Sequence, residues 1–395
     1  MIKSIYEAHF DGKNVLVRVD FNVPMDANRN ITDDTRVLET LPTIDKIIDD
    51  GGLPILCSHL GRPKGTRDEK YSLAPVAKLL EDKYGYKVFF ANDCIGETAK
   101  KAIADAELGS IVLLENLRFY KGETDNDPEF SKALASLGDI YVNDAFGAAH
   151  RAHASVVGAA ELFSERFAGK LMKAELLSLS KATSNPAKPY TVIIGGAKIS
   201  GKIDVIRNLM NICDNILIGG GMMFTFFKAQ GLEIGKSILE EDKIDLAKEL
   251  LELAQHSKVN LVLPIDTVTA DSFSNDAATS IVKVNSIKSD KLGMDIGPET
   301  CKLFADIISQ AKTIVWNGPM GVFEMENFAN GTFQIAQAIA QATSRGAFSV
   351  IGGGDSVSAI KKTKLDREVS HISTGGGASL EYLEGKELPG VKALE

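Results

Sequence analysis

The stretch Val192-Ile193-Ile194-Gly195-Gly196, a short apolar run followed directly by two glycines, sets the pattern on which the fold of this chain depends. Similar runs rich in Val and Ile recur along the sequence, and segments of helical periodicity separate them. Such runs are typical of parallel strands that crossover helices bury on both faces, so we predict an α/β fold. The predicted strands are Val15–Val19, Leu53–Cys57, Val88–Phe90, Ile111–Leu114, Ile140–Val142, Val192–Ile194, Ile216–Ile218, Leu261–Leu263, Ile314–Trp316, Phe348–Ile351 and His371–Ser373.

A length of 395 residues favours two domains rather than one. A helix-like segment from about Val156 to Ala182 separates the two series of strands, and it stops at Asn185–Pro189, where two prolines prevent its continuation. We therefore predict two doubly wound, Rossmann-like parallel-sheet domains over residues 1–170 and 186–379, joined by a hinge helix over residues 171–185.

The composition argues against several classes of protein. The chain has 44 Lys and Arg against 53 Asp and Glu, a net charge of −9, which disfavours nucleic acid and anionic lipid as partners. Its four cysteines never form a C-x-x-C pair, so neither a disulfide scaffold nor a zinc ribbon fits. No apolar run approaches the roughly 18 residues of a membrane span. We expect a cytoplasmic protein with no membrane partner.

The two halves differ in the residues that follow their strands. Eight of the 11 arginines lie in the first 170 residues. The second half instead holds four glycine clusters, each after a predicted strand: Gly195-Gly196, Gly219–Gly221, Gly352–Gly354 and Gly375–Gly377. Ligands of open α/β sheets bind at the carboxyl ends of the strands. One half is therefore expected to bind an anion with side chains, and the other to offer bare backbone to a ligand.

Candidate anion ligands near strand ends are Arg36, Arg62, Arg118 and Arg151. A guanidinium group can donate two parallel hydrogen bonds to a carboxylate or phosphate, so several together suit a small polyanion. Each of them alone is better explained as a solvated surface arginine, or as an ion-pair partner of a neighbour such as Asp33 or Glu115, whereas the four together favour an anion site.

Two further polar pairs lie in the first half. Asp20 and Asn22 end the first strand, where they either hydrogen-bond a substrate hydroxyl or form a turn. His150 and His153 have a spacing compatible with metal ligation, but no cysteine or third histidine is near, and Arg151 stands between them. An intervening cation argues against a metal site at this pair.

Residues 196–203, GAKISGKI, begin as a P-loop and then depart from it. They satisfy G-x-x-x-x-G-K, but Ile203 stands where a P-loop needs Ser or Thr to ligate magnesium. Lys198 and Lys202 still indicate phosphate contact, because cations are poorly placed at a helix start unless an anion binds there. The G-x-G-x-x-G fingerprint is also absent, which weakens a nicotinamide-dependent oxidoreductase as an alternative.

The segments Gly352–Ser356 and Thr374–Ser379 each join a predicted strand to a helix. Backbone N–H groups at such helix starts form an anion cradle when no Cβ obstructs them, although glycine also serves in tight turns. Asp355 is placed to hold the magnesium that accompanies a nucleotide. The two halves together indicate phosphoryl transfer between a small anionic substrate and a nucleotide, without naming the substrate.

Longer motifs in the chain closely resemble those of phosphoglycerate kinase. They are Arg18–Pro24, Ser58–Pro63, Glu115–Phe119, Asn143–Phe146, His150–Ser155, Gly195–Lys202, Trp316–Glu324, Gly352–Ser356 and Ser373–Ser379. The resemblance covers essentially the whole chain and is to a bacterial-type member. It implies a monomeric, cytoplasmic kinase of glycolysis that transfers a phosphoryl group reversibly between MgATP and the carboxylate of 3-phosphoglycerate, giving 1,3-bisphosphoglycerate and MgADP. It also implies that residues 380–395 pack back onto the first domain.

The resemblance further implies which residues act. Arg36, Lys198 and the N–H groups of Gly353 and Gly376 would be catalytic. The residues implied to bind phosphoglycerate are Asp20, Phe21, Asn22, Arg36, His59, Leu60, Gly61, Arg62, Arg118 and Arg151. Those implied to bind the nucleotide are Lys202, Gly219, Gly220, Gly293, Asn317, Pro319, Glu324, Gly353, Gly354, Asp355 and Ser356, with Asp355 on its Mg²⁺. One departure is Gly201, where members often carry an acidic or larger residue.

Two other functions stay open at this point: a nicotinamide-dependent oxidoreductase, and a scaffold that binds anions without turnover. Binding of NADH without binding of ATP would favour the oxidoreductase over a kinase. Binding of ligands without turnover would favour the scaffold. Because the two ligands are expected on different domains, we also expect closure about the segment from Val156 to Ala182, which would exclude water from the acyl phosphate.

Overall fold

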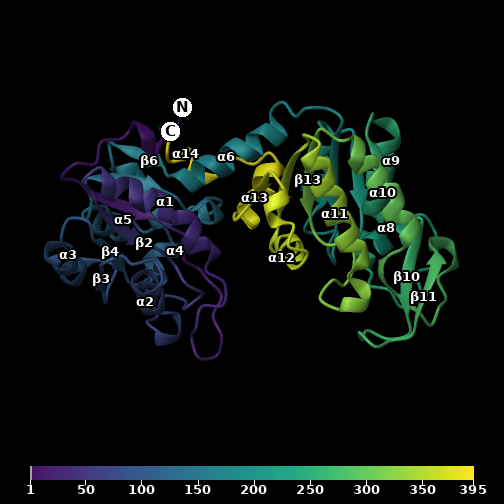
Figure 1. Ribbon diagram of the computed structural model, residues 1–395, viewed down its shortest axis with the longest axis horizontal. Coiled ribbons are helices and arrows are strands. Elements are labelled where there is room, and N and C mark those ends of the chain that lie inside the picture. Colours follow the sequence, from purple (N-terminus) through teal and green to yellow (C-terminus); the bar gives the residue numbers. More distant parts are fainter. Residues whose placement is uncertain (1) are drawn as a thin grey trace. The chain divides into compact units, whose positions relative to one another are not determined.

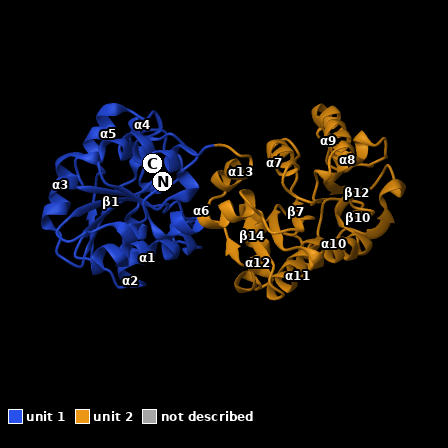
Figure 2. Cartoon of the chain, turned by 90° about the horizontal axis from the view of Figure 1, so that it is seen from above, with its two compact units in different colours: residues 1–176, 387–395 blue, residues 177–386 orange. Residues whose placement is uncertain are grey.

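The computed structural model describes residues 2–395 (Figure 1). The chain forms two compact units (Figure 2). Unit 1 contains the chain up to Leu176 together with Glu387–Glu395, and unit 2 is Leu177–Lys386. Each unit contains a six-stranded sheet whose strand pairs are all parallel. The predicted α/β class with two doubly wound sheets is therefore confirmed.

Unit 1 is built on a sheet of order β3-β4-β2-β1-β5-β6. Its strands are β1 (Asn14–Arg18), β2 (Leu53–Cys57), β3 (Val88–Ala91), β4 (Ile111–Leu114), β5 (Ile140–Asn143) and β6 (Arg166–Ala168). Its helices are α1 (Thr35–Asp49), α2 (Ala74–Asp82), α3 (Gly96–Asp105), α4 (Lys121–Thr124), α5 (Pro128–Ala135) and α14 (Pro389–Lys392), with the short turns η3 (Leu117–Phe119) and η5 (Ala154–Gly158). The boundary between the units falls within α6 (Lys170–Thr183).

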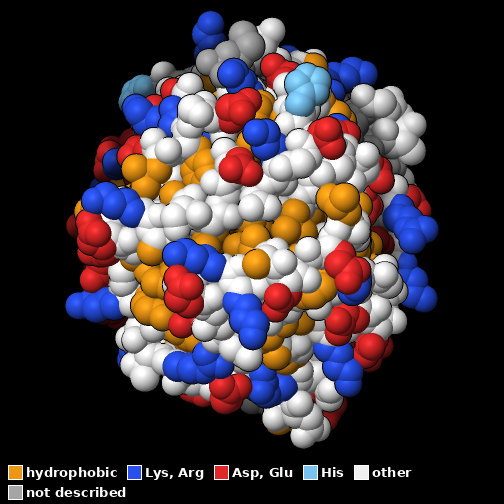
Figure 3. Space-filling model, turned by 90° about the vertical axis from the view of Figure 1, so that its left-hand side faces the viewer, with side chains coloured by type: hydrophobic (Ala, Val, Ile, Leu, Met, Phe, Trp, Pro, Cys, Tyr) orange, Lys and Arg blue, Asp and Glu red, His pale blue; other side chains and the backbone are white. Residues whose placement is uncertain are grey.

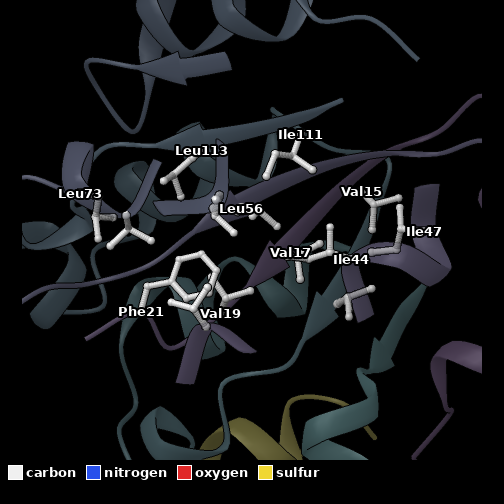
Figure 4. Close-up of a cluster of buried hydrophobic side chains, with 14 of the residues drawn as sticks. Val15, Val17, Val19, Phe21, Ile44, Ile47, Leu56, Leu73, Ile111 and Leu113 are labelled. Atoms are coloured by element: carbon white, nitrogen blue, oxygen red, sulfur yellow. The ribbon is translucent and has the colours of Figure 1, made fainter. Parts of the chain in front are cut away.

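The core of unit 1 forms where β1 packs against α1 (Figure 4). Val15, Val17 and Val19 are fully buried, as are Ile44 and Ile47 of the helix. Burying each such side chain contributes roughly 1.5–3 kcal/mol to folding. This packing fixes the position of β1 and hence of the polar residues that follow it.

Unit 2 is built on a sheet of order β15-β14-β13-β7-β8-β9, beside a three-stranded antiparallel sheet of order β11-β10-β12. Its strands are β7 (Tyr190–Ile194), β8 (Asn215–Ile218), β9 (Asn260–Val262), β10 (Asp266–Ala270), β11 (Thr279–Lys283), β12 (Leu292–Ile296), β13 (Thr313–Asn317), β14 (Phe348–Gly352) and β15 (His371–Ile372). Its helices are α7 (Ile203–Leu209), α8 (Met223–Ala229), α9 (Ile244–His256), α10 (Pro298–Gln310), α11 (Asn330–Ser344), α12 (Gly354–Lys362) and α13 (Gly377–Leu383).

Both parallel sheets reverse their direction of growth at a central strand. In unit 1 this happens between β1 and β5, and in unit 2 between β7 and β13. The connections after such a pair leave on opposite faces of the sheet, which opens a crevice at the carboxyl ends of the two strands. These two places are where the fold can bind a ligand.

The prediction of one helix-like segment over residues 156–182 is wrong. Strand β6 lies within that segment and pairs with β5, and α6 begins only at Lys170. Gly169 separates the strand from the helix, and its lack of a side chain lets the backbone approach the Asp144 carboxylate, which a Cβ would overlap. The periodicity of the segment did not reveal this strand, which has only three residues.

The small antiparallel sheet of unit 2 is absent from the predicted strands. Its edge strand β11 is mostly exposed, and its sequence Thr-Ser-Ile-Val-Lys lacks the continuous apolar run that marks the buried strands. Exposed antiparallel strands carry a weaker sequence signal than strands buried on both faces.

The surface shown in Figure 3 mixes Lys and Arg with Asp and Glu, and hydrophobic side chains lie between them. That face therefore presents no field of a single sign. Within residues 2–395, no helix combines the length and apolar character needed to cross a bilayer.

The C-terminal segment gives a test of the packing in unit 1. The Gly390 N–H donates to the Ala149 carbonyl at 2.8 Å, and a Cβ at Gly390 would lie 2.5 Å from Cγ1 of Val156. We predict that Gly390→Ala lowers the free energy of unfolding by about 1–3 kcal/mol because the added methyl overpacks this contact. Denaturant unfolding measures it. Gly201→Ala is the control, because a Cβ there meets nothing within 4 Å; equal effects at both positions would contradict the packing argument.

Candidate active site

The polar rim of unit 1 begins just after β1, where Arg36 meets Asp20. Arg36 Nη1 donates to Asp20 Oδ2 at 2.8 Å and to the Asn22 carbonyl at 3.3 Å. Arg36 lies in the first turn of α1, as the sequence indicates, and forms an ion pair with Asp20. The pair brings together two of the residues expected to bind substrate.

A second set of contacts ties the loops after β1, β2 and β4 to one another. The Gly61 N–H donates to Asn22 Oδ1 at 2.9 Å, and Arg118 Nη1 donates to the Gly61 carbonyl at 2.7 Å. The Nε atom of Arg118 is buried without a hydrogen-bond partner among residues 2–395. A buried guanidinium with an unpaired N–H is costly unless an acceptor binds there, so this edge favours an anionic ligand.

The positive charges of this site act on one another. Burial, followed by the charges of neighbouring arginines, holds the pKa of His59 well below its ordinary value of 6.5; these arginines are Arg18, Arg118, Arg151 and Arg36. Burial and nearby arginines also lower the pKa of Arg118 to about 10. Mutual repulsion of this kind is relieved when an anion binds among the cations.

The same field, together with burial, keeps His153 after β5 uncharged at neutral pH. Burial and the charges of Arg118, Arg18 and Arg151 lower the pKa of His153 to about 4. The neighbouring His150 accepts a hydrogen bond at its Nε2 from Arg151 Nε at 3.1 Å. Among residues 2–395, no three or more His, Cys, Asp or Glu side chains gather so as to hold a metal ion.

Three other residues implied for the substrate differ in their exposure. Phe21 and Leu60 belong to the hydrophobic core, and Figure 4 shows Phe21 beside Val19 within it. Only the backbone of these two residues remains for a ligand. Arg62 follows Gly61 and is exposed.

The glycines after β7 and β8 allow the backbone of unit 2 to pack closely. The Gly195 N–H donates to the Asn317 carbonyl at 3.0 Å, and the Gly196 N–H donates to that of Pro319 at 2.9 Å. A Cβ at Gly219 would overlap the Met320 side chain. The loops after β7, β8 and β13 are therefore joined at the sheet edge.

Two more glycines implied for the nucleotide are also required by packing. A Cβ at Gly220 would overlap the backbone of Gly196, and one at Gly293 would overlap the ring of Phe224. Packing within the protein is therefore sufficient to require glycine at these two positions, whether or not a ligand lies beside them.

Lys202 and Asn317 form the polar centre of unit 2. The Lys202 ammonium donates to Asn317 Oδ1, and Asn317 Nδ2 is buried without a partner among residues 2–395. Burial lowers the pKa of Lys202 to about 8, against the opposing effects of Asp355 and Glu384. Burial disfavours the charge of Lys202, and the Asn317 amide has an unpaired donor. A phosphate group would suit both, because it supplies negative charge and hydrogen-bond acceptors.

Two helices of unit 2 begin with glycine at their N-caps, and the first lies beside this centre, because a Cβ at Gly353 would lie 3.2 Å from Asn317 Nδ2. Gly353, at φ 82°, precedes α12, and Gly376, at φ 53°, precedes α13. No side chain caps either helix. Both glycines have the left-handed conformation that other residues avoid, and uncapped helix starts attract anions.

The remaining residues implied for the nucleotide, and Lys198, differ in their burial. Ser356 accepts a hydrogen bond at Oγ from the Gly318 N–H at 2.6 Å, so it positions the loop after β13. Gly354, Asp355, Lys198 and Glu324 are exposed. Exposure leaves the two charged groups Lys198 and Asp355 available to a ligand.

Two residues were missed by the sequence reasoning. Glu240 accepts hydrogen bonds at Oε2 from the N–H groups of Ile199 at 2.6 Å and Ser200 at 3.2 Å, and so holds the loop that carries Lys198. Glu123 is fully buried beneath the arginines of unit 1. Neither lies at a strand end, so the pattern of strand ends could not find them.

Comparison with known proteins agrees with this geometry. A family model described as phosphoglycerate kinase matches residues 5–386. The chain is 55% identical over 392 residues to phosphoglycerate kinase of Chlorobium phaeobacteroides (strain BS1), covering 99% of each protein. The chain belongs to the phosphoglycerate kinase family.

Other phosphoglycerate kinases extend the comparison. Cytosolic phosphoglycerate kinase 3 of Arabidopsis thaliana is 53% identical over 394 residues, covering 100% of this chain and 98% of the relative. The solved phosphoglycerate kinase of Coxiella burnetii is 42% identical with a TM-score of 0.90, covering 100% of this chain and 99% of that one. That of Pyrococcus horikoshii OT3 is 32% identical with a TM-score of 0.85, covering 100% and 98%. The family resemblance stated from the motifs is therefore confirmed.

The lowered pKa of Lys202 gives a prediction for nucleotide binding. Lys202 is protonated below about pH 8 and loses its charge as the pH rises through that value. If the charged form binds phosphate, the affinity for MgADP should fall between roughly pH 7 and pH 9, and calorimetry should show proton uptake on binding in that range. Lys202→Arg keeps its charge and should flatten the profile. Identical pH profiles for the two proteins would contradict this role of Lys202.

Proposed function

We propose that this chain performs the reaction of its family, the reversible transfer of a phosphoryl group between ATP and the carboxylate of 3-phosphoglycerate. Membership of the phosphoglycerate kinase family and the presence of two complementary sites support this proposal. The observation that carries it is the crowding of arginines after the strands of unit 1, together with an unpaired guanidinium N–H. A substrate with both a carboxylate and a phosphate provides acceptors for several such groups.

In this proposal the acid binds to unit 1. Asp20 and Asn22 would bind the substrate hydroxyl, and Arg36 would hold the carboxylate that reacts. The substrate phosphate would lie among Arg62, Arg118 and Arg151, with the neutral His59 and the backbone of residues 21, 60 and 61 beside it. Ion pairing of Arg36 with Asp20 keeps the guanidinium near the position where the carboxylate is needed.

The chemistry then requires no general base. A carboxylic acid of ordinary pKa, roughly 4, is already ionised at neutral pH and is the nucleophile. One carboxylate oxygen forms a bond to the γ-phosphorus of ATP as the bond from that phosphorus to the bridging oxygen of ADP breaks, and no proton is transferred. Depressed pKa values for His59 and His153 agree with a site in which neither residue exchanges a proton.

Charge repulsion between carboxylate and polyphosphate is the barrier that the protein must lower. Lys198 and Arg36, with the N–H groups of Gly353 and Gly376, would face the oxygens of the transferring group. Donors fixed in advance stabilise a developing charge more than mobile water does. Lys202, Asn317 and Ser356 would hold the phosphates of the nucleotide, and Gly354, Pro319 and Glu324 would border it. Gly219, Gly220 and Gly293 would lie near the adenine.

The donor set also suits the magnesium that accompanies ATP. Asp355 is an exposed carboxylate in the first turn of α12, and Mg²⁺ binds carboxylate oxygens while keeping several waters and phosphate oxygens. We assign Asp355 as the protein ligand of that ion, which would neutralise phosphate charge.

Transfer requires the two ligands to meet, although their residues belong to different units. We propose that residues 171–185 form the hinge between a phosphoglycerate domain, residues 1–170 with the C-terminal segment, and a nucleotide domain that begins at residue 186. Of the segment expected to pack back, residues 380–395, only Glu387–Glu395 belongs to unit 1, and residues 380–386 belong to unit 2. Closure would exclude water from the acyl phosphate product. We further propose that the enzyme acts as a cytoplasmic monomer.

The direct test of the proposed function is turnover with 3-phosphoglycerate and MgATP, coupled through glyceraldehyde-3-phosphate dehydrogenase to NADH oxidation. We expect turnover that depends on both substrates. Folded protein that binds nucleotide but gives no turnover would contradict the proposal.

Arg36→Ala tests whether Arg36 binds the reacting carboxylate of 3-phosphoglycerate. We expect kcat to fall by roughly 100-fold or more, because a fixed donor to the reacting group is lost. Lys87→Ala, an exposed lysine paired with Glu107, serves as the control and should leave kcat unchanged. Full activity of Arg36→Ala would remove Arg36 from the mechanism.

Lys198→Ala tests stabilisation of the transferring group. A residue that acts in the transition state should lower kcat strongly, again by roughly 100-fold, with little change in the dissociation constant of MgATP. The exposed Lys258 in the same unit provides the control variant Lys258→Ala. A defect confined to nucleotide affinity would instead make Lys198 a binding residue.

A further inference from the structure

Beneath the arginines of unit 1 lies a buried hydrogen-bonded chain, Glu123–Ser155–Arg18–His59. All four side chains are buried, and Glu123, Ser155 and Arg18 have no exposed surface. The residues come from four places in the sequence: α4, η5, the end of β1, and the loop after β2. None of these contacts is between sequence neighbours, so the tertiary fold assembles the chain.

Every hydrogen bond in this chain has a defined direction. Ser155 Oγ donates to Glu123 Oε1 at 2.7 Å, and the Ser155 N–H donates to Oε2 at 2.9 Å. An ionised carboxylate can only accept, so the serine proton points toward Glu123. Ser155 Oγ therefore offers a lone pair to Arg18 Nε, which donates to it at 2.7 Å.

Arg18 in turn determines which ring nitrogen of His59 accepts a hydrogen bond. Its Nη1 donates to the Val19 carbonyl, and its Nη2 lies 3.1 Å from His59 Nδ1. A guanidinium has donors only, so Nδ1 of His59 must be the acceptor and cannot carry a proton. A neutral histidine with a bare Nδ1 carries its single proton on Nε2.

We infer that Glu123 is a positioning residue for the anion site, which acts through Ser155 and Arg18 to fix His59 as the neutral Nε2–H tautomer. In this form His59 donates one hydrogen bond to an anionic oxygen of the substrate. It does so without adding a full charge to the repulsion among the arginines. Protonation of Nδ1 would place an N–H against the Arg18 guanidinium, and this agrees with the low pKa of His59, which burial and the charges of four arginines cause.

Glu123 also supplies charge balance. The two carboxylates whose attraction opposes the lowering of the Arg118 pKa are Glu123 and Asp20. Asp20 lies at the rim and pairs with Arg36, whereas Glu123 lies underneath, where a ligand cannot displace it. The anion site thus has a permanent counter-charge behind it.

The tautomer is read directly from long-range ¹H–¹⁵N spectra of the full-length protein labelled with ¹⁵N-histidine. His59→Gln identifies the His59 signals among the six histidines. We expect an Nε2-protonated, Nδ1-bare signature that persists from pH 6 to pH 8, an interval chosen to span the ordinary histidine pKa of about 6.5. An Nδ1–H tautomer, or a charged ring at pH 7, would overturn the inference.

Variants test the chain that fixes the tautomer. Glu123→Gln and Ser155→Ala should give a mixture of tautomers or a His59 pKa that moves into the observed range, and should raise the KM for 3-phosphoglycerate several-fold with a smaller change in kcat. Glu129→Gln removes an exposed carboxylate of the neighbouring helix α5 and should change neither. An unchanged tautomer and unchanged KM in folded Ser155→Ala would refute the positioning role.

The inference rests on the proposed function only for the identity of the anion. Inorganic phosphate is therefore used as a second probe, and we expect it to shift the Nε2–H resonance of His59 in the parent protein. Absence of turnover with a correct tautomer would contradict the proposed function alone. Turnover with the wrong tautomer would contradict only the inference.

Discussion

The parallel pairing of β1 with β5, and of β7 with β13, is the constraint on which both candidate sites depend. Parallel strands direct their carboxyl ends to the same edge, so the residues that follow them gather there. Arg18 ends β1 opposite Asn143 of β5, and Asn317 ends β13 opposite Ile194 of β7. The buried Val and Ile side chains fix these registers, and the polar residues that follow are positioned as a result.

The two units solve different electrostatic problems at equivalent edges. Unit 1 crowds guanidinium groups, whose charges together with burial lower the pKa of Arg118 and His59, and the carboxylates Asp20 and Glu123 oppose the lowering at Arg118. Unit 2 uses few charged side chains and relies on glycine loops, uncapped helix starts and the partly buried Lys202. The first arrangement offers fixed cationic side chains to an anion, and the second lets a ligand approach the backbone closely.

The predicted fold depended on the buried strands, and these were the most reliable part of the sequence analysis. Each of the 11 predicted runs overlaps a strand of the structure, because strands buried on both faces need continuous apolar residues. The short β6 and the exposed β11 could not be recognised in this way. Strands β10 and β12 of the antiparallel sheet were missed as well, although β10 is largely buried, because their sequences Asp-Thr-Val-Thr-Ala and Leu-Gly-Met-Asp-Ile lack a continuous apolar run.

The candidate site was predictable where its residues follow strands, as at Asp20, Arg36 and Arg118. Buried residues that lie beneath the site could not be predicted in this way. Glu123, for example, lies in a short helix and accepts a hydrogen bond from Ser155, which is 32 positions away in the sequence. The glycines carry a mixed signal. Gly353 and Gly376 have positive φ at helix starts, whereas Gly293 is required by the ring of Phe224, and the sequence alone does not distinguish these reasons.

The central claim is that the acid is bound by unit 1 and the nucleotide by unit 2, and hydrogen–deuterium exchange with single ligands tests it most directly. The account predicts that 3-phosphoglycerate alone slows exchange in residues 20–22, 58–62 and 117–120. MgADP alone should slow exchange in residues 195–202 and 352–356. Protection of the unit 2 loops by 3-phosphoglycerate, or of the arginine loops of unit 1 by MgADP, would contradict the account.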